Sequence, residues 1–310
     1  MSTRPVPWRG PNVPNERKDL PGALIRAGAL ALALATGLSA CGDDDKESKK
    51  GGGAAKAGGN EIAFTVSETG KTAKITAPKT AEGGVANLKL TNSGKAPHEA
   101  QLLRIEGDQT PQDVFKAVQD DTAKNEWLRA EGGVGQTPPG ATATATVQLK
   151  AGRYMVADLS NEEGQPAYAE FKVTGGGEGS LPSTDTTVTA AEVGDDKYKW
   201  ELSSPLKSGG STITFKSEGK EALHFVGAAR LTKEVSKKEV VKSFDEEGPP
   251  PPFIDEKSFT STAILDGGKS QVAQFNLSKP GKWVLFCPLP DRGENKSHTQ
   301  QGLVEIIDVE

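Results

Sequence analysis

Histidine, cysteine and methionine are scarce in this sequence, which has three, two and two of them in 310 residues. Two cysteines can form at most one disulfide bond, so a scaffold held together by several disulfides is excluded. The 37 lysines and arginines do not outnumber the 42 aspartates and glutamates, so the basic face of a nucleic-acid-binding protein is not expected. No Ser-His-Asp order, glycine-rich phosphate loop or HExxH motif stands out, and we expect no enzyme activity.

Turn-forming residues, by contrast, are abundant. The chain contains 36 glycines and 20 prolines, a composition that favours short strands joined by turns over long helices. The length corresponds to about two domains. We therefore expect an all-β protein built from two modules.

The first 40 residues are typical of a secretory signal peptide. Five basic residues lie within positions 1–26, and an uncharged run rich in alanine and leucine, Ala27–Gly37, follows them. This run is too short to span a membrane as a helix, but it suits the apolar segment of a signal. The residues Leu38–Cys41 resemble the bacterial lipobox. The resemblance implies cleavage before Cys41 and attachment of a lipid to its thiol, which would hold the protein at the outer face of the cytoplasmic membrane or in the cell envelope.

Two stretches of small and polar residues divide the rest of the chain. Residues 41–60 contain no large apolar side chain and are expected to form a flexible tether. Residues 175–185 (GGGEGSLPSTD) are expected to form a linker. They leave two segments of similar length, residues 61–174 and 186–310.

These two segments repeat one another. Each contains an alternating strand, a Gly-Lys turn and a histidine that opens the next strand, and the histidines, His98 and His224, lie 126 positions apart. The later motifs Lys150–Tyr154 (KAGRY) and Lys279–Trp283 (KPGKW) lie 129 positions apart. Two matching features at nearly one spacing indicate an internal duplication.

Period-2 alternation of apolar and polar residues predicts strands with one buried face in both copies. The expected strands are Leu88–Leu90, Thr142–Leu149 and Ala169–Val173 in the first copy, and Ser211–Phe215, Gln271–Leu277 and Leu303–Val309 in the second. One short helix is expected in each copy, capped by Thr110 in the first and spanning Thr232–Phe244 in the second. The fold expected is all-β, with two Greek-key β-sandwich domains that each carry one inserted helix.

The scarce residues of the second copy fall where such a sandwich would bring them together. His224 opens a strand, while Cys287 and His298 lie between the last two strands. A thiolate with two imidazoles is a ligand set that holds copper for electron transfer.

With this set the sequence resembles the cupredoxin family, of the plastocyanin and azurin kind. The resemblance covers residues 186–310 best, and it implies that His224, Cys287 and His298 bind copper. The axial methionine of the family is replaced here by Leu303, so the site would be three-coordinate or would use Gln300 or Gln301. In the first copy Asp158 stands at the place of Cys287. Only His98, followed by Glu99, remains of the set, and we interpret this copy as a cupredoxin-like domain that has lost its metal.

Two functions from different classes stay open at this point. The first is an exported, lipid-anchored protein whose second domain binds copper for electron transfer or copper handling, with a redox or copper-delivery protein as its partner. The alternative is a metal-free cell-surface protein that binds a protein or glycan, in which Cys287 is a small buried hydrophobe. No nucleic-acid partner is expected in either case.

Overall fold

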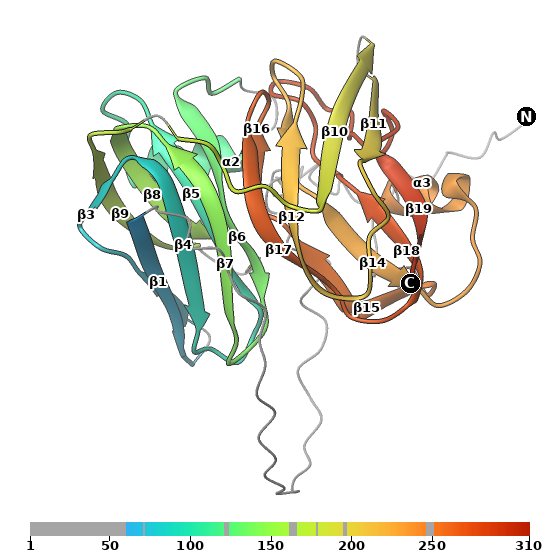
Figure 1. Cartoon of the computed structure of the whole chain (residues 1–310). Helices are drawn as coiled ribbons and strands as arrows, with labels where there is room; N and C mark the ends of the chain where they lie inside the picture. The colour runs from blue at the N-terminus through green and yellow to red at the C-terminus, as the bar shows by residue number, and fades with distance from the viewer. Residues whose placement is uncertain are drawn as a thin grey trace, which may run out of the picture.

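The computed structural model describes residues 60–70, 72–120, 124–160, 166–177, 179–194, 197–245 and 251–310. The predicted signal peptide, Cys41 and residues 41–59 of the predicted tether lie outside these ranges. Within them the chain is almost entirely β-structure, and the expected all-β sandwich is confirmed (Figure 1). Neither helix in the described ranges is long and apolar enough to cross a membrane.

The first repeat supplies the strands at the blue and green end of the chain (Figure 1). Its elements are β1 (Asn60–Thr69), β2 (Thr72–Thr76), β3 (Thr80–Glu82), β4 (Gly84–Asn92), β5 (His98–Ile105), α2 (Pro111–Gln119), β6 (Leu128–Thr137), β7 (Thr142–Leu149), β8 (Gly152–Asp158) and β9 (Ala167–Thr174). The strands predicted from alternation all lie within β4, β7 and β9. The core of this repeat is apolar and includes Phe64, Leu88 and Phe171.

The second repeat supplies the strands from yellow to red. Its elements are β10 (Thr186–Gly194), β11 (Lys197–Leu202), β12 (Gly209–Ser217), β13 (Leu223–His224), β14 (Gly227–Leu231), α3 (Lys237–Asp245), β15 (Ile254–Ser261), β16 (Leu265–Asp266), β17 (Ser270–Leu277), β18 (Gly281–Phe286) and β19 (Val304–Val309). The predicted strands again fall on β12, β17 and β19. Trp283 is completely buried at the centre of this core.

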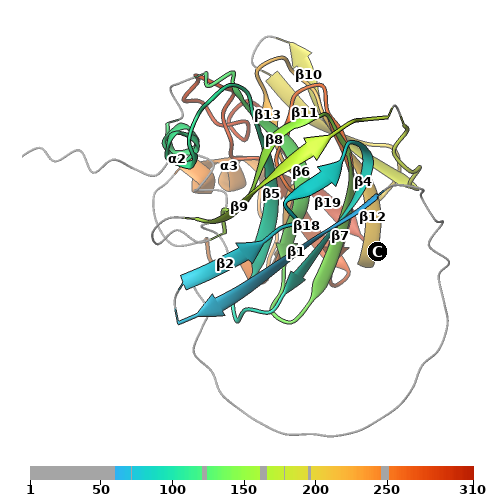
Figure 2. The same ribbon diagram turned by 90° about the vertical axis from the view of Figure 1, so that its left-hand side faces the viewer.

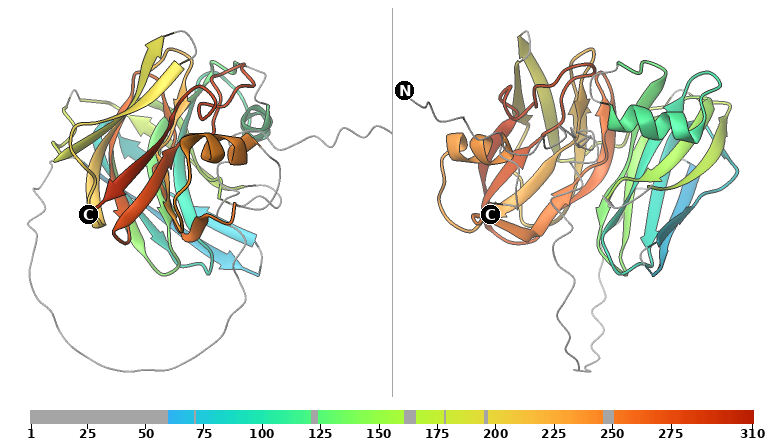
Figure 3. Two further views of the ribbon diagram at one scale, coloured as in Figure 1. Left: turned by 90° about the vertical axis from the view of Figure 1, so that its right-hand side faces the viewer. Right: turned by 180° about the vertical axis from the view of Figure 1, so that it is seen from behind.

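Both helices lie on the same side of the molecule (Figure 3, right). Thr110 caps α2 with a reciprocal pair of hydrogen bonds to Asp113, and Val114, Phe115 and Val118 face the sheet. The expected start of the second helix at Thr232 is wrong, because α3 begins at Lys237. The Ser236 hydroxyl accepts a hydrogen bond from the backbone amide of Glu239, and its backbone amide donates to the Glu239 carboxylate. This capping box fixes the first turn.

The strands form three sheets, two of which contain strands from both repeats. The eight-stranded sheet has the order β11-β10-β12-β17-β7-β4-β1-β2, and the seven-stranded sheet has the order β13-β16-β6-β5-β8-β9-β3. Strands β15, β14, β18 and β19 form a four-stranded sheet of the second repeat alone. The layers are seen edge-on in Figure 2. The predicted linker lies between β9 and β10. Hydrogen-bonded ladders nevertheless cross between the repeats, and the separation into two domains stays a prediction.

In the eight-stranded sheet the crossing is made by β7 and β17, which pair antiparallel through Ala145↔Ala273, Thr146↔Val272 and Val147↔Gln271. In the seven-stranded sheet β16 pairs with β6 through Leu265↔Glu131. Two buried glutamines complete the joint. Gln101 of the first repeat accepts a hydrogen bond from the backbone amide of Ile264 at 2.7 Å. In the opposite direction, Gln271 accepts one from the amide of Gly133 at 3.0 Å. Buried amide side chains with both groups paired fix the relative position of the repeats.

Candidate metal centre

Three elements of the second repeat bring His224, Cys287 and His298 together. His224 ends β13, Cys287 directly follows β18, and His298 lies in the loop that leads to β19. All three residues are 0% exposed. One ring nitrogen of each histidine and the sulfur of the cysteine lie within 4.8 Å of one another. The arrangement expected from the sequence is therefore present in space.

The hydrogen bond of His224 leaves one of its nitrogens without a partner. Its Nε2 lies 3.1 Å from the carbonyl oxygen of Glu218, which can only accept, so Nε2 carries the proton. The Nδ1 atom then has a free lone pair, and it is a buried polar atom with no hydrogen-bond partner. Leaving such an atom unpaired costs about 1–3 kcal/mol. A buried unsatisfied atom of this kind needs an explanation, and an imidazole nitrogen beside a thiol is a donor pair that can bind a metal.

His298 is oriented in the same sense by a carboxylate. Its Nε2 donates a hydrogen bond to Oδ1 of Asp291 at 2.9 Å. Its Nδ1 lies 3.6 Å from the sulfur of Cys287. Metal-ligating histidines are commonly held in this way, with the second ring nitrogen hydrogen-bonded to a carboxylate or a carbonyl oxygen. Both histidines thus turn the atom that can bind a metal toward the centre.

The electrostatics of the site keep all three groups neutral. Burial, and then the nearby His298, hold the pKa of His224 well below its ordinary value. Burial also lowers the pKa of His298, although the hydrogen bond and charge of Asp291 act against it. Burial raises the pKa of the Cys287 thiol to about 12, while backbone hydrogen bonds from Phe225 and Leu289 oppose the rise. Neutral imidazoles are competent ligands, and a thiol of this kind loses its proton to a metal rather than to water.

Backbone hydrogen bonds close the loop that carries Cys287 and His298. The amide of His298 donates to the carbonyl oxygen of Leu289 at 2.8 Å, and the amide of Leu303 donates to that of His298 at 2.7 Å. The amide of Cys287 donates to the carbonyl oxygen of Leu303 at 3.2 Å. Ligands on a loop tied to itself in this way are pre-organised, so little conformational entropy is lost when they bind.

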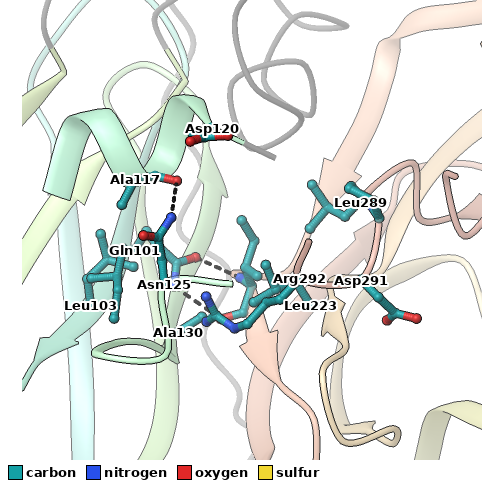
Figure 4. Close-up of a pocket in the computed structure, with 13 residues that line it drawn as sticks. Gln101, Leu103, Ala117, Asp120, Asn125, Ala130, Leu223, Leu289, Asp291 and Arg292 are labelled. Carbon is teal, nitrogen blue, oxygen red and sulfur yellow. Dashed lines mark hydrogen bonds between the residues drawn. The ribbon is translucent and has the colours of Figure 1, made fainter. Parts of the chain in front are cut away.

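The same loop reaches the first repeat. A small pocket of about 30 Å³ lies between the two repeats, and Asp291 and Arg292 are among the residues that line it. In Figure 4, Asp291 points away from the pocket. Arg292 forms an ion pair with Asp266 at 2.6 Å, and Asp266 in turn accepts a hydrogen bond from the backbone amide of Ala130 at 3.1 Å. The ligand loop is therefore anchored against the first repeat.

The three residues considered for the axial position differ in burial. Leu303 is 0% exposed and belongs to the apolar core that also contains Cys287. Gln301 is buried and its Oε1 has no hydrogen-bond partner, whereas Gln300 is exposed. An axial role for any of the three stays a prediction.

The corresponding place in the first repeat is filled by an ion-pair cluster. His98 opens β5 and Asp158 ends β8. Nδ1 of His98 lies 2.6 Å from Asp158, and Nε2 lies 2.8 Å from Glu68. Both ring nitrogens are therefore bound to carboxylates and neither is free for a metal. The next residue, Glu99, donates its backbone amide to Asp158, and burial, followed by the charge of Asp158, raises the pKa of its carboxyl to about 8.

Sequence reasoning missed Asp291, Tyr198 and Glu68. Asp291 closes the stretch Cys287-Pro-Leu-Pro-Asp291, and its position between Cys287 and His298 was a usable signal. Tyr198 packs its ring against both histidines of the site, with ring centroids 4.7 Å from each. It comes from β11, and nothing in its local sequence relates it to the ligand loop. Glu68 meets His98 across a separation of 30 residues.

Comparison with known proteins gave no match among protein-family models and none among curated proteins. Solved structures of copper proteins are similar to parts of the chain. Auracyanin B is 17% identical, with a TM-score of 0.27, over 40% of this chain and 86% of its own. Auracyanin A, described as a "blue" copper protein from Chloroflexus aurantiacus, is 13% identical, with a TM-score of 0.27, over 40% of this chain and 96% of its own.

A longer alignment is found with a multicopper oxidase. It is 12% identical, with a TM-score of 0.22, and covers 81% of this chain and 88% of the oxidase. With TM-scores of this size, the likenesses support no inference about the chemistry of this chain, which has to come from its own residues.

Proposed function

We propose that His224, Cys287 and His298 bind one copper ion in a cupredoxin-like domain. The observation that carries the proposal is the buried Nδ1 of His224, which has no hydrogen-bond partner and lies in a cluster with a thiol and a second imidazole. If the site bound no metal, that nitrogen would stay unpaired, at a cost in the stability of the folded protein. The residues present therefore fit a metal.

The donor set favours copper over other metals. Thiolate is a ligand of Cu(I), imidazole also suits Cu(II), and copper bound by both supplies one-electron redox chemistry. Catalytic zinc sites keep an open position for water, whereas all three residues here are fully buried and Leu303 beside them is apolar. The side chains of this chain hold and orient the ligand atoms and exclude water from them.

Asp291 and Glu218 have supporting roles in this proposal. Each accepts the Nε2–H of one histidine and so fixes the ring that presents Nδ1. No group in the site is placed to act on an organic substrate, so we propose a carrier of electrons or of copper rather than an enzyme. The partner is then a redox or copper-delivery protein.

The proposed place of action rests on the sequence alone. The lipobox-like residues before Cys41 support export, lipidation of Cys41 and anchorage at the outer face of the membrane or in the envelope. Expression of Cys41→Ser in a bacterial host, followed by separation of membranes, tests this. We expect the variant to leave the membrane fraction, and retention of Cys41→Ser in that fraction contradicts the anchor.

The metal proposal is tested with the full chain and one equivalent of Cu(II). We expect an intense visible absorption from thiolate-to-copper charge transfer, and no colour with Zn(II). Cys287→Ser should abolish the absorption. His98→Gln is the matched control, because it removes the equivalent imidazole of the first repeat. It should lower the stability of the protein but leave the absorption of the folded, copper-loaded chain unchanged. Copper uptake that survives both Cys287→Ser and His224→Ala refutes the proposal and favours the metal-free alternative.

A further inference from the structure

The ring of Tyr198 covers the His–Cys–His cluster. Tyr198 lies on β11, is 5% exposed, and meets the rings of His224 and His298 edge-on, at interplanar angles of 77° and 63°. The centroids of the two imidazoles lie only 4.2 Å apart. One aromatic side chain therefore contacts both histidines at once.

The hydroxyl of Tyr198 is tied to the carboxylate that orients His298. It lies 2.9 Å and 3.0 Å from the two oxygens of Asp291, to which it donates. The same carboxylate accepts the hydrogen bond from Nε2 of His298. Tyr198 thus fixes the orientation of His298 through Asp291, in addition to covering its ring.

Two glycines make room for Tyr198. Gly219 has a φ of +96°, and a Cβ atom there would lie 2.8 Å from the Tyr198 hydroxyl oxygen. Gly302, in the ligand loop, has a φ of +110°, and a Cβ atom there would lie 2.6 Å from the Tyr198 carbonyl oxygen. Backbone that must approach this closely requires glycine. The loops on either side are therefore shaped around this residue.

Strand β11 is well suited to move. Among the described strands it is the last one of the eight-stranded sheet and has a ladder only on its β10 side. On the other side, the amide of Tyr198 donates one hydrogen bond to the carbonyl oxygen of Gln301 at 3.1 Å. A strand held on one side opens at a lower free energy than a central strand.

We propose that Tyr198 is the gate of the site, a positioning residue whose ring closes the cluster and whose hydroxyl sets His298 through Asp291. Access to Cys287, and exchange of a metal held there, then require β11 to open. The statement about metal exchange rests on the proposed function, but the statement about access to the thiol does not. A delivery protein would have to displace this side chain.

The test compares Tyr198→Phe and Tyr198→Leu with Trp200→Phe in the full chain. Trp200 is a matched control, because it is buried on the same strand and its Nε1 has no hydrogen-bond partner to lose. The first measurement is the rate of iodoacetamide modification at Cys287 without metal, followed by peptide mass spectrometry so that Cys41 is counted separately. Tyr198→Phe should accelerate modification about fivefold, the factor that corresponds to about 1 kcal/mol for one hydrogen bond.

Tyr198→Leu should accelerate modification further. Trp200→Phe loosens β11 without removing a contact to the cluster, and it should accelerate modification less than either Tyr198 variant. The second measurement is the transfer of bound copper to a chelator, with the visible spectrum as a readout. Both Tyr198 variants should transfer faster, and Tyr198→Phe should shift the absorption because Asp291, which orients His298, loses its hydrogen bond from the Tyr198 hydroxyl. Equal modification rates in the three variants and the wild type overturn the gate. Faster modification in a chain that takes up no copper upholds the gate and refutes the copper proposal.

Discussion

Replacement of Asp158 by alanine should destabilise the protein strongly, although the residue lies outside the candidate metal centre. Asp158 is completely buried. Its carboxylate accepts hydrogen bonds from His98 at 2.6 Å, from the Ser160 hydroxyl at 2.6 Å and from the Glu99 amide at 3.1 Å. Asp158→Ala leaves these donors unsatisfied in the interior. Breaking one side of a buried ion pair costs about 3–5 kcal/mol, a large part of the roughly 5–15 kcal/mol that stabilises a domain.

The loss should depend on pH, because His98 titrates within this cluster. Burial by itself lowers the pKa of His98, but the hydrogen bonds and charges of Asp158 and then Glu68 outweigh it and raise the pKa above its ordinary value of 6.5. The folded state binds the proton of His98 more tightly than the unfolded state does. The stability that protonated His98 contributes is therefore complete below pH 6.5 and is lost as the pH rises through the folded-state pKa. The cost of Asp158→Ala should therefore be larger at about pH 6 than at about pH 9.

Urea denaturation followed by tryptophan fluorescence, at both pH values, gives the free energies of unfolding. Asp308→Asn is the control, because it breaks an ion pair with Lys282 in which Asp308 is 77% exposed. Such a surface pair is worth about 0–1 kcal/mol. If the free energy of unfolding of Asp158→Ala lies within about 1 kcal/mol of the wild-type value, or if the difference between them grows with pH, then Asp158 and His98 do not form a buried ion pair.

Three further outcomes are expected. Leu303→Met should lower the reduction potential of the copper-loaded protein in a redox titration, because it adds an axial ligand and the higher coordination number favours Cu(II). An unchanged potential would exclude position 303 as axial. Gly302→Ala should lower the free energy of unfolding by about 1–3 kcal/mol, because alanine is strained at this φ and its Cβ would meet the Tyr198 carbonyl oxygen. If urea denaturation shows no change in that free energy, the close approach is contradicted. Gln101→Leu should lower the free energy of unfolding by about 1–3 kcal/mol in the same measurement, because the buried amide of Ile264 loses its acceptor. A variant that is more stable than the wild type would contradict that hydrogen bond.

Much of the fold could be predicted from the sequence because its signals are local. Alternation identified β4, β7, β12 and β17, since period-2 burial is a property of the strand itself. The start of α3 was missed although Ser236-Lys-Lys-Glu239 is a capping-box signature. The pairing of β7 with β17 could not be predicted, because an alternating strand does not encode which other strand it meets.

The residues of the candidate site likewise differ in whether the local sequence reveals them. His224, Cys287 and His298 could be found because the chain has so few residues of these types and they fall next to predicted strands. Tyr198 could not, because it meets Asp291 across 93 residues and an alternating Lys-Tyr-Lys-Trp strand carries no sign of that contact. Glu68 is a similar case, as one of many acidic residues whose role depends on the register of β1.

The ladder between β7 and β17 also determines whether either repeat can exist apart from the other. Cut from its neighbour, each would present an open edge of unpaired amides and carbonyl oxygens, and such an edge is a template for association with other chains. Joined, the two edges satisfy one another within the molecule. The first repeat, in which carboxylates occupy both ring nitrogens of His98, would thus still protect its partner from self-association, which gives a physical reason for a chain to retain it.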